Sequence, residues 1–290
     1  MLGQKEVLLK SILLPLTAQI HEHIVIDASI SIASWLDATI NGLFIRPDPR
    51  TSVSFMGEGL TADMIQDLCE ATENEGRAQA EKCEQTFNRS MAAADIDFKP
   101  ETKGATARWR VAVGEVTDHV GRKARTADLA VCPQPSTTQP GAQEILNDLI
   151  YRSGRPVLMV PDTGIQRSLD HIMIAWNGRA EGARAVGAAL PFLKRAGKVT
   201  LLQLGEINED RPSLSDVADY LADHGVRSNI LTDEAFTGNV GEAILKHADD
   251  EQADMIVVGA YSHSRWREMI LGGVTRHLVQ HSHKPIFMSH

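Results

Sequence analysis

The residues with the most capacity for chemistry lie in the stretch GAYSHSRWREMILGG, from Gly259 to Gly273. It holds one imidazole and two guanidinium groups, from His263, Arg265 and Arg267, together with two serine hydroxyls. Glycines near both ends let a backbone approach an anion closely. The pattern predicts a phosphate-binding loop. The alternative is a long surface crossing between a strand and a helix, in which the arginines are solvated.

Two regular elements must position this stretch. It leaves an expected strand at Asp254–Gly259 and returns to a helix that begins near Gly273. Ligands bind at the carboxyl edge of open parallel sheets, and a helix start offers free N–H groups and the positive end of the helix dipole. We expect a bound phosphate to contact the backbone of residues 262–264 and 272–275. Asn177, at the end of a neighbouring strand, would meet the sugar or base.

The chain repeats one pattern twice. Ala127–Pro133 (ADLAVCP) and Ala253–Gly259 (ADMIVVG) each place an Asp before an unbroken apolar run, which is typical of a strand buried on both faces of a parallel sheet. Ser153–Pro161 (SGRPVLMVP) and Ser282–His290 (SHKPIFMSH) each set a basic residue and a Pro before a short strand. Strands alternating with helices predict a mainly parallel sheet with helices on both faces.

The two copies differ in length. We expect the first to occupy residues 1–161 and the second residues 168–290. The extra length of the first copy lies at about 47–100, where Thr61–Asp95 predicts one long helix with a broken apolar stripe. The second copy has only a short helix at the corresponding place, near Ser213–His224.

These repeated segments resemble the universal stress protein family in its tandem two-domain form. The resemblance covers essentially the whole chain and is strongest from Ile172–Val186 (IMIAWNGRAEGARAV) onward. It implies an α/β fold: two tandem domains with open, Rossmann-like parallel sheets of the adenine-nucleotide alpha-hydrolase type, each with five strands. It also implies that the two domains pack as a pseudo-dimer, the intramolecular counterpart of the family's homodimer. Further homodimerisation stays open.

The family's nucleotide-binding members carry a glycine, two residues, a glycine, nine residues and then Gly-Ser or Gly-Thr. Gly259 and Gly272 match two of these glycines. Ser262 replaces the other glycine, and Gly273 stands where the family has Ser or Thr. The family's acid at the end of the first strand falls on Asn177, which can still hydrogen-bond a ribose hydroxyl or an adenine edge. The resemblance implies binding of ATP or a related adenine nucleotide by the second domain. The candidate binding residues are Ala175, Asn177, Gly259, Ser262, His263, Gly272, Gly273, Val274 and Thr275.

The first copy lacks the features of such a site. After its buried strand it runs CPQPSTTQPG, with Pro133, Pro135 and Pro140 where amide donors are needed. Proline has no N–H to offer an anion. Thr17 replaces the acid at the end of the first strand. We expect this half to bind no nucleotide.

Two histidines invite a metal interpretation. His277 and His281 lie four residues apart on an expected helix, a spacing that suits two zinc ligands. No cysteine or carboxylate obviously completes a tetrahedral set, and imidazoles also suit a helix C-terminus. We therefore expect no metal site, with zinc kept as an alternative.

No catalytic pattern is recognisable. The sequence has no GxSxG and no GxxxxGK[ST], and its three cysteines form no CxxC pair, as expected for free thiols in a reducing compartment. We expect a protein that is not an enzyme, with slow ATP hydrolysis suggested by analogy alone.

Composition limits the partners. Acidic residues outnumber basic ones by 38 to 29, for a net charge of -9, which disfavours nucleic acid as a partner. Since no apolar run approaches the ~20 residues of a membrane span, we expect a soluble, cytoplasmic protein. The resemblance implies a stress-response function with unknown protein partners. The alternatives are a scaffold protein without nucleotide and a small-ligand or zinc-binding stress protein.

Overall fold

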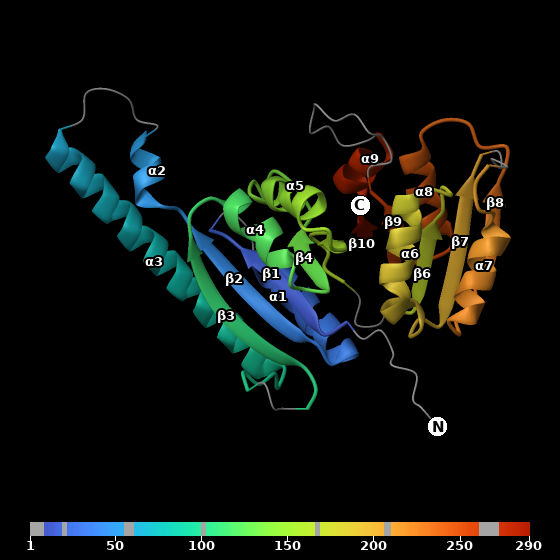
Figure 1. Cartoon of the computed structure of the whole chain (residues 1–290), viewed down its shortest axis with the longest axis horizontal. Helices are drawn as coiled ribbons and strands as arrows, with labels where there is room; N and C mark the ends of the chain where they lie inside the picture. Colours follow the sequence, from blue (N-terminus) through green and yellow to red (C-terminus); the bar gives the residue numbers. More distant parts are fainter. Residues whose placement is uncertain are drawn as a thin grey trace.

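The computed structural model describes residues 9–18, 22–54, 61–99, 103–165, 169–205, 210–260 and 273–290. Within these residues, ten strands form one continuous sheet in the order β3-β2-β1-β4-β5-β10-β9-β6-β7-β8 (Figure 1). All neighbouring strands are parallel except β5 and β10, which pair antiparallel at the centre. The sheet therefore consists of two five-stranded parallel halves joined at β5 and β10.

Both halves follow the same order of elements, except that the first half has one additional helix, α2. The first half contains β1 (Ser11–Leu16), α1 (Glu22–Leu36), β2 (Thr39–Arg46), α2 (Pro49–Ser54), α3 (Ala62–Ala93), β3 (Thr106–Val113), α4 (Val116–Ala124), β4 (Leu129–Pro133), α5 (Ala142–Arg152) and β5 (Val157–Val160). The second half contains β6 (His171–Ala175), α6 (Ala180–Leu193), β7 (Lys198–Leu204), α7 (Leu214–Asp223), β8 (Asn229–Asp233), α8 (Val240–Asp250), β9 (Met255–Gly259), α9 (Gly273–His281) and β10 (Ile286–Ser289). The expected α/β fold with two parallel sheets packed as a pseudo-dimer is confirmed.

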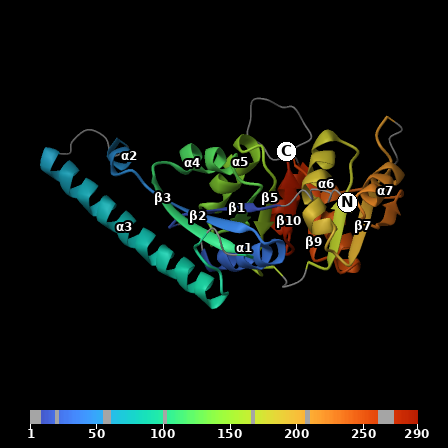
Figure 2. The ribbon, with the colours of Figure 1, turned by 60° about the horizontal axis from the view of Figure 1, so that its bottom comes forward.

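Helices cover both faces of the sheet. In the first half α1 and α3 pack on one face, while α4 and α5 pack together on the other, as Figure 2 shows. The indole of Trp35 in α1 lies 5.8 Å from the ring of Phe192 in α6, so the helix layer on that face continues across the junction. Because the halves meet through antiparallel strands, their carboxyl ends lie at opposite edges of the sheet.

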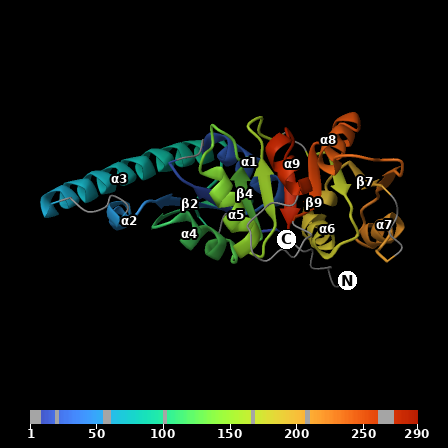
Figure 3. The same ribbon diagram turned by 90° about the horizontal axis from the view of Figure 1, so that it is seen from above.

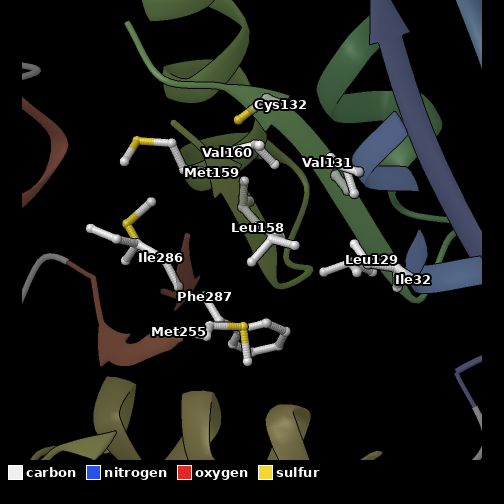
Figure 4. Close-up of a cluster of buried hydrophobic side chains, with 14 of the residues drawn as sticks. Ile32, Leu129, Val131, Cys132, Leu158, Met159, Val160, Met255, Ile286 and Phe287 are labelled. Atoms are coloured by element: carbon white, nitrogen blue, oxygen red, sulfur yellow. The ribbon is translucent and has the colours of Figure 1, made fainter. Parts of the chain in front are cut away.

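The apolar runs identified in the sequence form the centre of the sheet. Every residue of β4 and β5 is buried, whereas the edge strands β3 and β8 expose much of their length. Figure 4 shows buried side chains near the junction, among them Leu158, Ile286 and Phe287. The strands of both repeats thus share one hydrophobic core, which stabilises the two halves together.

The repeated Asp of the ADLAVCP and ADMIVVG segments has a structural role. The Oδ2 atom of Asp128 accepts hydrogen bonds from the amides of Lys10 (2.9 Å) and Ser11 (3.0 Å), where β1 begins. Its counterpart Asp254 accepts two amides at the start of β6, at 2.9 and 2.8 Å. Each carboxylate satisfies donors that the neighbouring strand leaves unpaired, so this part of the repeat serves the fold.

The expected long helix of the first half is present as α3, which runs past the end of the sheet beside α2 (Figure 3). Its N-cap is Thr61, whose hydroxyl accepts from the amide of Met64 at 3.3 Å. The short helix of the second half is α7, which has a capping box formed by Ser213 and Asp216. The first residues of the two expected helices, Thr61 and Ser213, are thus the N-caps of α3 and α7.

Candidate functional site

A cleft with a volume of about 260 Å³ lies at the carboxyl ends of β6, β7 and β9 in the second half. Five of the residues predicted to bind a ligand line it, namely Ala175, Asn177, Gly259, Val274 and Thr275. Gly273 begins α9 beside them but does not line the cleft. The predicted residues Ser262, His263 and Gly272 lie outside the described residues. The fold thus brings β6, β9 and the first turn of α9 to one place.

Gly259 and Gly273 have different structural roles. A Cβ added to Gly259 would lie 2.5 Å from the amide nitrogen of Gly182 and 2.7 Å from Cγ of Glu181, so glycine is needed here for β9 to approach α6. A Cβ added to Gly273 would meet nothing within 4 Å among the described residues. Among the described residues nothing crowds Gly273, while Gly259 both permits the approach of β9 to α6 and lines the cleft.

Asn177 forms a turn at the start of α6. Its Oδ1 accepts a hydrogen bond from the amide of Arg179 at 3.1 Å, which is an Asx turn of the kind that leads into a helix. Since Oδ1 is used in this way, the side-chain NH₂ group is the part of Asn177 left to meet a ligand. The amide can donate to a hydroxyl or a ring nitrogen, and unlike the family's acid it carries no charge toward phosphate.

Trp176 contributes to the cleft without filling it. Its residue exposure is only 8%, and its indole Nε1 donates to the carbonyl of Pro212 at 3.0 Å. This bond ties the end of β6 to the segment before α7. The bulk of the indole is placed against α6 and α7, where Trp176 also lines a second hollow with Val186 and Tyr220.

Arg211 is a residue of the cleft that sequence reasoning missed. Of the described residues that line the cleft, Arg211 alone is charged. Its guanidinium donates to the carbonyl of Asn177 at 3.1 Å and forms no ion pair with any described carboxylate. The side chain rests on Gly178, where a Cβ would lie 2.7 Å from that of Arg211. A guanidinium held in this way suits a phosphate oxygen.

No local pattern could have identified Arg211, because it precedes the capping box of α7 and reaches the cleft only through tertiary structure. Gly178 was a weak sequence signal of a turn, because it lies shortly after the end of β6. Its φ of +68° is a left-handed conformation that favours glycine.

A buried carboxylate lies beside the cleft. Glu181 is only 7% exposed, and its Oε1 has no hydrogen-bond partner among the described residues. The residue sits in the first turn of α6, where the helix dipole favours a negative charge. It packs under Gly259 and is not among the cleft-lining residues.

The first half has a cavity of about 380 Å³ at the corresponding strand ends, lined by Thr17 at the end of β1. Its charged lining residues are all acidic: Glu75, Glu115 and Glu144. Partial burial, together with the charges of Glu115 and Asp148, raises the pKa of Glu144. Glu144 lies in the first turn of α5, the position that Gly273 occupies in α9. Carboxylates here repel phosphate, so the absence of nucleotide binding in this half stays a prediction with a second physical reason.

The histidines considered as metal ligands make local contacts. The rings of His277 and His281 lie 4.5 Å apart, and Nδ1 of His277 is 3.1 Å from the side-chain nitrogen of Asn239. In the part of the chain that the structure describes, no group of three or more His, Cys, Asp or Glu side chains could hold a metal ion. The pair therefore gains no third ligand from the described elements.

The fold and its cavities define a class of protein: two tandem Rossmann-like halves, each with a cavity at the carboxyl ends of its parallel strands, acidic in the first half and lined by Arg211 in the second. Comparisons with known proteins identify the family. Residues 168–290 match the universal stress protein family. The second half belongs to this family, and the chain as a whole has the tandem two-domain form found in its structural relatives.

The similarity to individual proteins is low in sequence and extensive in fold. A universal stress protein of Methanocaldococcus jannaschii is 29% identical over 80 residues, which are 28% of this chain and 48% of the relative. One from Synechocystis sp. is 23% identical over 140 residues, or 46% of each chain. The chain thus aligns with about half the length of these relatives.

Two solved structures share the whole fold. A universal stress protein from Archaeoglobus fulgidus has a TM-score of 0.70 at 16% identity, covering 96% of this chain and 97% of its own. A putative universal stress protein from Pseudomonas aeruginosa has a TM-score of 0.55 at 12% identity, covering 97% and 93%. In the described part of this chain, no helix combines the length and apolar character needed to cross a membrane.

Proposed function

We propose that this chain is a cytoplasmic stress-response protein whose second half binds ATP or a related adenine nucleotide as a regulatory ligand, without catalysing a reaction. One observation carries the proposal. The cleft at the ends of β6 and β9 combines an apolar wall, the first turn of α9, and Arg211 as its charged lining residue among those described.

The described residues fit the chemistry of a nucleotide. Leu202, Ile244 and Val258 offer apolar contact to a base or sugar. The NH₂ group of Asn177 can donate to a hydroxyl or a ring nitrogen. Arg211 and the start of α9 present positive charge to phosphates. The nucleotide would supply charge and order to this edge of the sheet, and it would regulate partner binding by favouring one conformation of the chain.

Titration calorimetry of ATP and adenosine into the parent and the Arg211→Ala variant tests the proposal. We expect the parent to bind ATP. Removing a charged hydrogen bond costs about 1.5–3 kcal/mol, so the variant should bind ATP roughly tenfold to a hundredfold more weakly and adenosine about equally well. Arg89→Ala, which removes an exposed arginine of α3, is the charge-matched control and should leave both affinities unchanged.

An absence of heat with both ligands in the parent would contradict nucleotide binding. The leading alternative would then be a scaffold or interaction protein without nucleotide. The departures of Ser262 and Gly273 from the family pattern favour that alternative.

A further inference from the structure

A further pocket, of about 170 Å³, lies between β3 and the end of α4 in the first half. Arg108 and Arg110 of β3 form one wall, and Lys123, from the last turn of α4, forms another. The buried side chains of Leu13 and Leu43 belong to its lining. We call this cavity the basic pocket. It lies near the amino end of β1, away from the strand ends that form the acidic cavity of the same half.

The strand register brings its polar groups together. Arg108 pairs with Asn41 and Arg110 with Leu43 across the parallel strands β2 and β3, so both arginines project from the same face as these partners. The Nδ2 atom of Asn41 donates to the hydroxyl oxygen of Ser11 at 3.1 Å. Because Ser11 accepts this bond, its own hydroxyl proton is left to be donated to a ligand.

Within the described residues, the three cations of the basic pocket have no ion-pair partner. Among the described residues, no carboxylate forms an ion pair with Arg108, Arg110 or Lys123, and no acidic residue lines the pocket. A nearby carboxylate, that of Asp128, uses its Oδ2 to accept amides at the start of β1. The protein as a whole has a net charge of -9, so this local excess of positive charge runs against its overall composition.

The second half shows that the fold does not need these cations. The Asp128 and Asp254 segments align β1 with β6. With this alignment, the strand registers make Arg108 equivalent to Asn229 and Arg110 equivalent to Leu231 in the repeat. Lys123 corresponds to Asp249 in the same alignment. The same architecture is thus built with no cation at these positions, so a structural need does not explain the three charges in the first half.

We propose that the basic pocket binds a small soluble molecule carrying a phosphate group. Two arginines at alternate positions of one strand lie about 7 Å apart and can donate to different oxygens of one tetrahedral dianion, while Lys123 adds a point charge. The cavity is smaller than the roughly 300–1,000 Å³ typical of drug-sized ligands, which favours a compact phosphate monoester. The proposal does not depend on nucleotide binding in the second half.

The test is an NMR titration of inorganic phosphate and glycerol 3-phosphate, at constant ionic strength set with chloride. We expect saturable amide shifts at Asn41, Gly42 and Arg110. The Arg108→Asn/Arg110→Leu double variant takes its side chains from the second half and should weaken phosphate binding at least tenfold. Arg108→Gln/Arg110→Gln provides a second, more polar variant with the same expected loss, and the thermal midpoint of each variant checks its fold.

Two controls separate this pocket from other sites. Arg89→Ala and Arg211→Ala should leave the shifts at Asn41 and Gly42 unchanged. The proposal is overturned if phosphate causes no saturable shift in the parent, or if the shifts gather at Gly178 and disappear in Arg211→Ala. It is also overturned if the protein sediments with phosphatidic acid vesicles but binds neither soluble phosphate, since the ligand would then be a lipid surface.

Discussion

Leu158 of β5 and Phe287 of β10 lie opposite each other in the antiparallel pair that joins the two halves. They are also equivalent residues of the repeat, because each is the second residue after the Pro in SGRPVLMVP and SHKPIFMSH. The flanking pairs, Met159 with Ile286 and Val157 with Met288, exchange in the same way. A pseudo-two-fold axis therefore passes through the Leu158–Phe287 pair, at the point where the two parallel sheets become one.

This relationship predicts that the junction stabilises both halves together. Phe287 is fully buried, and its ring lies 5.6 Å from that of Phe192. We expect Phe287→Ala to cost about 3–5 kcal/mol and Leu158→Ala about 2–5 kcal/mol. In urea unfolding followed by circular dichroism, each variant should lower the midpoint of one common transition. The exposed Ile230→Ala in β8 is the control and should shift the midpoint little. Two separate transitions in the parent would contradict the coupling.

Gly178 predicts a link between stability and ligand binding. An alanine there would hold φ near +68° and press its Cβ to 2.7 Å from that of Arg211. We expect Gly178→Ala to lower stability and to displace Arg211, weakening ATP binding in calorimetry. Gly225→Ala is a matched control, because Gly225 has a φ of +78° and open space around its Cβ position. The control should lose only the free energy needed to hold an alanine at positive φ, roughly 1–2 kcal/mol. Its ATP affinity should be unchanged. Equal ATP affinity in both variants would exclude a role for this packing.

The fold could be predicted in detail because its signals are local and repeated. The Asp-led apolar runs that end with Pro133 and Gly259 mark buried parallel strands, and each forms an inner strand of its half, β4 or β9. The predicted helix starts, Thr61 and Ser213, prove to be N-caps, and each side-chain hydroxyl accepts a hydrogen bond from the amide three residues on. The continuous ten-stranded sheet was not predicted, since the β5–β10 pairing joins strands far apart in sequence.

The candidate site was only partly predictable. The ends of the expected strands located Ala175 and Asn177, because parallel strands end at a common edge. Arg211 and the basic pocket depend on contacts between separate elements, and sequence spacing carries no trace of them. Gly259 has a structural role that the sequence pattern did not indicate, since glycine is required there for the approach of β9 to α6, while its part in anion binding stays a prediction.

Thiol reactivity gives an independent test of the packing. Burial, and then the charge of Glu22, raises the pKa of Cys83 to about 12, and complete burial also raises the pKa of Cys132. Cys69 is partly exposed. Since the thiolate is the reactive form, we expect Ellman's reagent at pH 8 to modify Cys69 first, and the other two thiols only on unfolding. Cys69→Ser should remove the rapid phase, and a rapid phase that persists in this variant would contradict the described burial.

His171 predicts a pH dependence of stability whose sign can be worked out. Burial, followed by the nearby charge of Lys198, lowers the pKa of this histidine, and its Nε2 lies 2.9 Å from the hydroxyl of Thr200. A hydrogen bond to the backbone of Glu251, followed by the charges of Glu251 and Asp254, opposes the shift without reversing it. In the unfolded chain the imidazole has its ordinary pKa of about 6.5, so the unfolded state binds the proton more readily. The stabilising contribution is therefore present above about pH 6.5 and is lost as the pH falls below it. Urea unfolding gives the free energy of unfolding of the parent and of His171→Gln at pH 8 and at pH 5.5. We expect the parent to lose stability relative to the variant when the pH is lowered. A difference that is the same at both pH values would show that His171 stays neutral, or stays charged, in both states.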